Sequence, residues 1–154
     1  MLYLLYGPDT YRSRRKLNEI IEGYRAKAGS DFNFHRLDAE EDGLARLNGI
    51  VETSSLFGGK KLVVVEQALL HESFAALMSA IEKCAHGSDT VLVLYHRGEL
   101  DEDAKKRLEE FRPYLTSAQE FRRLDRHRQE KTEFFLESPI SDLRSPISLF
   151  YSPG

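Results

Sequence analysis

The chain has 154 residues, of which 41% are hydrophobic and 31% are charged, and its formal net charge is −3. This balance is typical of one globular domain and argues against a protein that coats nucleic acid through overall positive charge. No stretch approaches the roughly 20 apolar residues of a membrane span, so we expect a cytoplasmic protein without membrane contact. The single cysteine, Cys84, excludes an intrachain disulfide and a cysteine zinc cluster, and it is expected to be a small buried side chain.

Strands and helices are predicted to alternate from the first residues onward. Residues 2–6 form an apolar run typical of a strand buried on both faces, and the run ends at Gly7. Asp9 or Thr10 is suited to cap a helix that extends to about residue 28, because a short oxygen-bearing side chain satisfies free amides in the first turn.

The second strand and helix are predicted from a change in period. Phe32 and Phe34 alternate with polar residues within 32–37, as in a strand near a sheet edge. The acidic stretch 38–42 suits the start of a helix. The apolar face of that helix is formed by Leu44, Leu47, Ile50 and Val51.

Five further elements complete the predicted domain. They are a strand at 62–65, a helix at 73–85, a strand at 91–95, a helix at 101–115 and a short strand at 118–121. Because strands alternate with helices, the expected fold is a three-layer α/β structure, with a parallel sheet of about five strands and helices on both faces.

A phosphate-binding loop would follow the first strand in a nucleotide-binding protein of this class. Such a loop requires G-x-x-x-x-G-K-[S/T], in which backbone amides and a lysine hold the phosphates. Counted from Gly7, the three required positions hold Arg12, Ser13 and Arg14. The sequence therefore predicts a P-loop-like fold without a functional P-loop, and without a nucleotide cofactor.

Other catalytic or metal-binding patterns are weak. Glu66 ends a strand where nucleotide hydrolases hold a metal, but Gln67 follows it, so Glu66 is interpreted as a structural carboxylate. The five histidines lack the H-E-x-x-H spacing of a zinc site, and His96 is interpreted as a polar loop residue after a strand. We expect no catalytic residue and no metal site.

Four segments together resemble the delta subunit of the bacterial DNA polymerase III clamp loader. They are residues 2–11, 55–65, 89–94 and 119–124, and the resemblance covers about residues 1–127. It implies an AAA+-like fold without ATPase activity, which agrees with the failed P-loop pattern. It also implies a non-catalytic subunit that binds the sliding clamp, the beta subunit, and helps to open it during DNA replication. The family label DNA-directed DNA polymerase would then belong to the holoenzyme.

The resemblance also implies a clamp-binding site. In the family, a Ser-Leu-Phe-like motif at a helix end enters a hydrophobic pocket on the clamp. The residues implied here are the anchors Leu56 and Phe57, with Glu52, Ser54 and Ser55 beside them. Two large apolar side chains next to glycines are good pocket-filling anchors, although both could instead fold back into the core. Ser54 departs from the family because a larger apolar residue is common there, so affinity is expected to be lower.

The domain organisation implied by the resemblance is incomplete. The family continues with a helical lid domain and a collar domain that joins other loader subunits. We expect residues 1–127 to form the delta N-terminal domain and 128–154 an irregular or disordered tail, with lid and collar absent as in a truncated delta. Assembly with other clamp-loader subunits would then need the missing domains to be supplied.

Two other functions remain open from the residues alone. The first is a small NTPase with an atypical phosphate site near Arg12. The second is a DNA-binding regulatory domain, because basic residues outnumber acidic ones in residues 122–131. The candidate DNA or anion contacts are Arg122, Arg123 and Arg126. If the chain is instead a delta subunit, its contact with DNA is expected to be indirect.

Overall fold

The computed structural model describes residues 1–28, 33–53, 59–70, 74–85 and 89–123. They contain one five-stranded sheet in which every pairing is parallel, with the order β2-β3-β4-β1-β5. The strands are β1 (Leu2–Tyr6), β2 (Phe34–Asp38), β3 (Lys61–Glu66), β4 (Thr90–Tyr95) and β5 (Ser117–Glu120). The predicted α/β fold with a five-stranded parallel sheet is confirmed.

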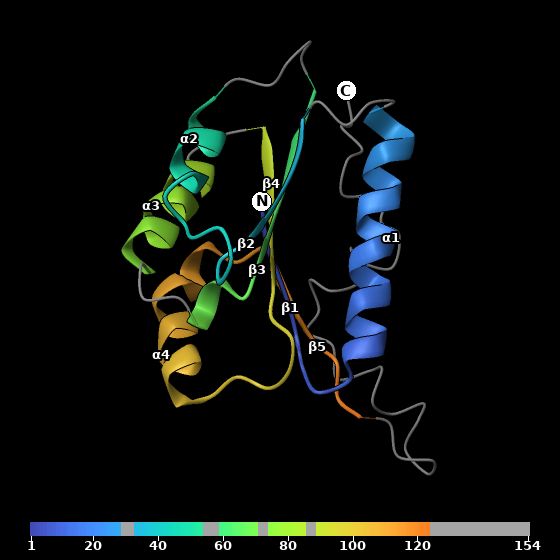
Figure 1. Ribbon diagram of the computed structural model, residues 1–154, viewed down its shortest axis with the longest axis vertical. Helices are drawn as coiled ribbons and strands as arrows, with labels where there is room; N and C mark the ends of the chain where they lie inside the picture. The colour runs from blue at the N-terminus through green and yellow to red at the C-terminus, as the bar shows by residue number, and fades with distance from the viewer. Residues whose placement is uncertain (29–32, 54–58, 71–73, 86–88, 124–154) are drawn as a thin grey trace.

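Helices cover both faces of the sheet and give three layers (Figure 1). Helix α1 (Thr10–Ala28) covers one face alone, while α2 (Leu47–Glu52), α3 (Phe74–Ala85) and α4 (Glu102–Phe111) cover the other. Two short 3₁₀ helices, η1 (Ala68–Leu70) and η2 (Arg112–Tyr114), complete the described elements.

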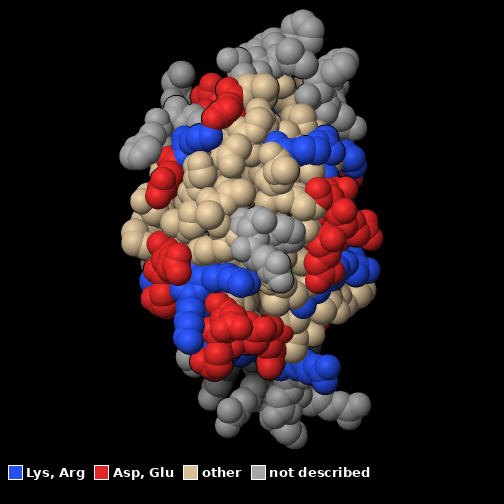
Figure 2. Space-filling model, turned by 60° about the vertical axis from the view of Figure 1, so that its left-hand side comes forward, with Lys and Arg blue, Asp and Glu red and all other residues tan. Residues whose placement is uncertain are grey.

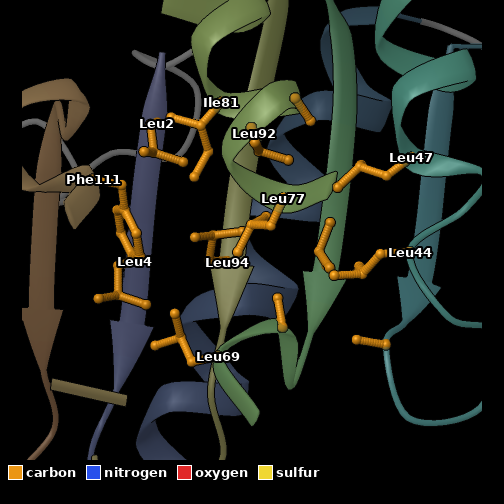
Figure 3. Close-up of a cluster of buried hydrophobic side chains, with 14 of the residues drawn as sticks. Leu2, Leu4, Leu44, Leu47, Leu69, Leu77, Ile81, Leu92, Leu94 and Phe111 are labelled. Carbon is orange, nitrogen blue, oxygen red and sulfur yellow. The ribbon is translucent and has the colours of Figure 1, made fainter. Parts of the chain in front are cut away.

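The two faces of the sheet bury separate hydrophobic clusters. Leu2, Leu4, Leu92 and Leu94 point toward α3 and α4 (Figure 3), whereas alternate residues such as Leu5 pack under α1. All six residues of β4 are buried, which explains why the central strands are continuous apolar runs rather than alternating ones.

Two helix boundaries differ from the prediction. The acidic stretch after β2 forms a turn and not a helix start, because the Asp38 carboxylate accepts from the Glu40 amide at 2.9 Å and that of Asp42 accepts from the Asp38 amide at 3.1 Å. The last helix ends at Phe111 and continues only as η2, which contains Pro113. Phe32 and the predicted tail at 128–154 lie outside the described residues. In the described part, no helix has both the length and the apolar character that crossing a bilayer requires.

Gly7 forms the sharp turn between β1 and α1. Its φ of +129° lies outside the range of ordinary L-residues, and a Cβ built there would lie 2.3 Å from the carbonyl oxygen of Phe121. Because that oxygen belongs to backbone rather than to a flexible side chain, the turn is built for glycine.

We expect Gly7→Ala to lower the free energy of unfolding by about 3 kcal/mol or more, from backbone strain and overpacking. Chemical denaturation measures the change. Gly49→Ala is the matched control, since Gly49 is exposed on α2 with no neighbour within 4 Å, and it should stabilise the protein by about 0.5–1 kcal/mol. Equal effects of the two substitutions would contradict the close approach at Gly7.

Candidate functional site

The turn after β1 occupies the place of a phosphate loop but uses its amides internally. The Gly7 amide donates to the carbonyl oxygen of Gly98 at 2.9 Å, and the Asp9 amide donates to that of Phe121 at 2.9 Å. The Arg12 amide donates to the Asp9 carboxylate at 3.1 Å, so Asp9 caps α1 as predicted. A phosphate is held by several free amides that converge on it, and this turn does not offer them.

Arg12, the strongest anion candidate of the failed P-loop, is part of the packed structure. Its guanidinium donates to the carbonyl oxygen of Arg122 at 3.2 Å and lies 5.8 Å from the centre of the Phe121 ring. It also lies 3.8 Å from the Asp9 carboxylate. These contacts tie the start of α1 to the end of β5, which is a structural role.

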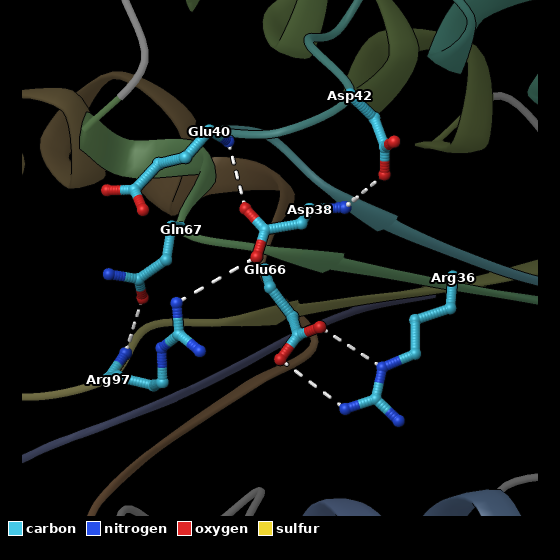
Figure 4. Close-up of polar contacts among 7 residues, drawn as sticks. All are labelled: Arg36, Asp38, Glu40, Asp42, Glu66, Gln67 and Arg97. Atoms are coloured by element: carbon cyan, nitrogen blue, oxygen red, sulfur yellow. Dashed lines mark hydrogen bonds and ion pairs between the residues drawn. The ribbon is translucent and has the colours of Figure 1, made fainter.

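A group of charged and polar residues lies at the carboxyl ends of β2, β3 and β4 (Figure 4). Glu66, the candidate remnant of a metal-holding acid, accepts from the Arg36 guanidinium at 3.1 and 3.4 Å. Asp38 lies 3.8 Å from the guanidinium of Arg97, whose amide donates to the Gln67 side chain at 2.6 Å. This supports the interpretation of Glu66 as a structural carboxylate. Within the described ranges, no cluster of three or more acidic, histidine or cysteine side chains could hold a metal.

The end of α2 and the start of β3 lie near the amino ends of the strands. Glu52, the last residue of α2, is exposed and forms an ion pair with Lys83 of α3. Lys83 also donates to the Asn48 side chain at 3.2 Å, so α2 is tied to α3 by side chains as well as by packing. Ser54, Ser55, Leu56 and Phe57 lie outside the described residues, between Thr53 and Gly59.

A family model for the DNA polymerase III delta subunit matches residues 3–118. The chain belongs to the DNA polymerase III delta-subunit family. The solved structure of the Bacillus subtilis DNA clamp loader delta protein (YqeN) is similar to it, with a TM-score of 0.63 and 28% sequence identity. That match covers 86% of this chain and 41% of the Bacillus protein, so the chain spans less than half of that relative. No curated protein matches the chain.

The family assignment and the fold confirm the resemblance stated from the four sequence segments. The matched range includes all of α2 and β3 and the residues between them, so it includes the predicted clamp-binding segment. The role of that segment remains a prediction.

The end of α2 is held by a residue that sequence reasoning missed. Lys61, in β3, is only 2% exposed, and its ammonium group reaches the backbone carbonyl oxygens of Ile50 and Thr53. It also donates to the Thr53 hydroxyl at 3.0 Å. Burial lowers the pKa of Lys61 because it penalises the charged amine. A lysine at the start of a strand gives no sequence signal for such a contact, since its acceptors are mostly backbone atoms.

The candidate DNA-contacting arginines follow β5 at the carboxyl ends of the strands, whereas Glu52 lies near their amino ends. Arg122 and Arg123 are exposed, and Arg122 lies 2.9 Å from the Glu120 carboxylate, which offsets its charge. Arg126 lies outside the described residues. On the face covered by α2, α3 and α4, acidic and basic side chains lie next to one another, so their fields largely cancel (Figure 2).

We expect isothermal titration calorimetry with Mg-ATP to give no saturable binding, because the amides of the β1–α1 turn already have acceptors. The sample is the DNA-free chain at micromolar concentration, and Mg-ATP is added up to the millimolar range. Saturable binding that Arg12→Ala abolishes would instead support the NTPase alternative.

His96 lies in the loop after β4, as expected, and its side chain is buried. Its Nε2 lies 3.2 Å from the carbonyl oxygen of Glu99. Among the described residues its Nδ1 has no hydrogen-bond partner, so a second proton there would be buried unsatisfied. Burial lowers the pKa of His96, although the nearby carboxylates of Asp101 and Glu40 act in the opposite direction.

The lowered pKa of His96 predicts a pH-dependent stability. Below the ordinary histidine pKa of about 6.5 the unfolded chain binds a proton that the folded chain resists, so the free energy of unfolding falls as the pH falls. We expect His96→Gln to reduce this slope between about pH 6.5 and pH 5, measured by denaturant unfolding at several pH values. Parallel curves for wild type and variant would contradict the prediction, since other titrating groups contribute equally to both.

Proposed function

We propose that this delta-family chain binds the sliding clamp through residues 54–57, with Glu52 beside them, and acts without hydrolysing ATP. The observation that carries the proposal is the family match over residues 3–118, which includes this segment. The name of the Bacillus subtilis relative, a DNA clamp loader delta protein, supports the same activity class.

The chemistry of the segment suits a pocket-binding anchor. Leu56 and Phe57 are adjacent large apolar side chains, and burying each of them contributes about 1.5–3 kcal/mol. A few such residues carry most of the free energy of a typical interface. Ser54 buries less apolar surface than a larger residue would, so the affinity falls at the lower end of what the motif allows.

The described residues on both sides of the segment are well anchored. Thr53 is contacted by Lys61, and the carbonyl oxygen of Lys60 accepts from the Tyr24 hydroxyl at 3.1 Å. The Lys61 amide donates to the carbonyl oxygen of Asp89 at 2.9 Å. A segment whose two ends are fixed loses less conformational entropy when it binds, which favours affinity.

The closed β1–α1 turn supports a non-catalytic role. In the proposed mechanism the chain opens the clamp by binding its open form more tightly than its closed form, because a ligand shifts an equilibrium only by its differential affinity. ATP would act on other subunits, and assembly with them would require the lid and collar domains of the family.

Neither alternative function is favoured by an observation. An NTPase would need the amides at Gly7 and Asp9, which donate within the fold. A DNA-binding regulator would need a basic surface, but Arg122 lies against Glu120.

The double substitution Leu56→Ala with Phe57→Ala tests the proposal. We expect it to weaken binding to the immobilised cognate clamp by at least about 100-fold in surface plasmon resonance, from the lost burial of two apolar side chains. Thermal unfolding should show an intact fold. Tyr11→Ala is the matched control: Tyr11 is a large side chain, 75% exposed, on the helix of the other layer, and its loss should leave clamp binding unchanged. Unchanged binding by the double variant would refute the proposed site.

A further inference from the structure

We infer that Lys61 is a positioning residue for clamp binding, which holds the end of α2 next to the position in the chain where residues 54–57 follow. This inference rests on the proposed function and deepens it. Among the described residues, the ammonium group of Lys61 contacts the protein's own helix end, so Lys61 is inferred to act through the segment and not on the clamp.

The burial of Lys61 shows that its contacts are specific. A lysine side chain is rarely buried without partners, because removing its charge from water is costly. Lys61 is 2% exposed, although it lies in the first position of a strand where a lysine could reach solvent. Its ammonium group instead reaches oxygen atoms of Ile50 and Thr53.

Two of the acceptors are carbonyl oxygens at the end of a short helix, and the Ile50 oxygen also accepts from the Thr53 hydroxyl at 2.8 Å. α2 has only six residues, and the last carbonyl oxygens of a helix lack partners within it. A cation near a helix carboxyl end also interacts favourably with its negative partial charge. Such a short helix is marginal alone, so its last turn depends on contacts like this one.

The position of the contact in the chain links it to the clamp-binding segment. The contact joins Lys61 to Thr53, and residues 54–58 lie between these two positions in the sequence. The strand that carries Lys61 pairs with β2 and β4, so the anchor belongs to the interior of the sheet. The contact therefore joins the described residues at the end of α2 to the start of β3.

Lys61→Met tests the inference, since methionine retains much of the apolar stem and removes the ammonium group. Lys60→Met is the matched control at the neighbouring position. We expect hydrogen exchange of residues 47–53 in the full chain to become at least about tenfold faster in Lys61→Met, while exchange in β4 changes little. In surface plasmon resonance with the cognate clamp, the same variant should bind about tenfold more weakly, comparable to the loss of a charged hydrogen bond.

Two further variants separate positioning from general stability. Val91→Ala removes buried surface under α1, in the other hydrophobic cluster, and should lower stability without altering clamp affinity. Thr53→Val removes the hydroxyl, which accepts from Lys61 and donates to the carbonyl oxygen of Ile50 at 2.8 Å, while the two carbonyl acceptors of Lys61 stay in place. It should therefore produce a smaller change in the same direction as Lys61→Met. It also serves as the test if Lys61→Met does not fold.

The outcomes distinguish this inference from the proposed function. If wild type binds the clamp and Lys61→Met binds equally well, or if exchange at 47–53 is unchanged, the positioning role is wrong. If Lys61→Met and Val91→Ala weaken clamp binding equally, Lys61 acts only by stabilising the fold, and the positioning role is likewise wrong. If wild type itself does not bind the clamp, the proposed function fails, and the clamp-positioning role fails with it.

Discussion

The backbone hydrogen bonds around Gly7 determine what this sheet can do. In nucleotide-binding α/β proteins, the turn after the first strand presents free amides to phosphate. Here the same turn donates to Gly98 and Phe121, while the amide of Gly98 donates back to Gly7 at 3.1 Å. The approach is so close that a Cβ at Gly7 would collide with backbone. The amides of the β1–α1 turn are therefore used by the fold itself.

Because the β1–α1 turn at the carboxyl ends of the strands is occupied by internal hydrogen bonds, the amino ends of the strands are the place where the proposed partner-binding segment lies in the chain. In a parallel sheet, each loop that leads from a helix into a strand lies at the amino ends of the strands. The end of α2 and the start of β3 lie there, remote from the β1–α1 turn, and Lys61 joins them. A partner-binding site at the amino ends of the strands does not disturb the packing at their carboxyl ends. The division is compatible with the protein-binding role proposed here for this member of the delta-subunit family.

The sequence predicted the fold well because burial dominates it. Residues 2–6, 62–65 and 91–95 are apolar runs that must be covered on both faces, and they form β1, β3 and β4. Local hydrogen bonding was harder to predict: Asp38 and Asp42 suit a helix start equally well in sequence, yet they close a turn. The Lys61 contact could not be predicted, since a buried lysine and an exposed one have the same local pattern. Leu56 and Phe57 were identified through the family resemblance. They lie outside the described residues, and their role stays a prediction.

The physical demands on a clamp-opening protein without ATP explain why anchoring matters under the proposed function. Such a protein obtains its effect only from the difference between its affinities for two forms of the ring. A loosely held anchor adapts to both forms and therefore discriminates poorly, whereas a fixed anchor favours the form that matches its position. A buried ammonium group that joins a strand within the sheet to a six-residue helix supplies that rigidity where packing alone is limited. In this arrangement the sheet matters for binding because its β3 strand fixes the origin of the binding segment.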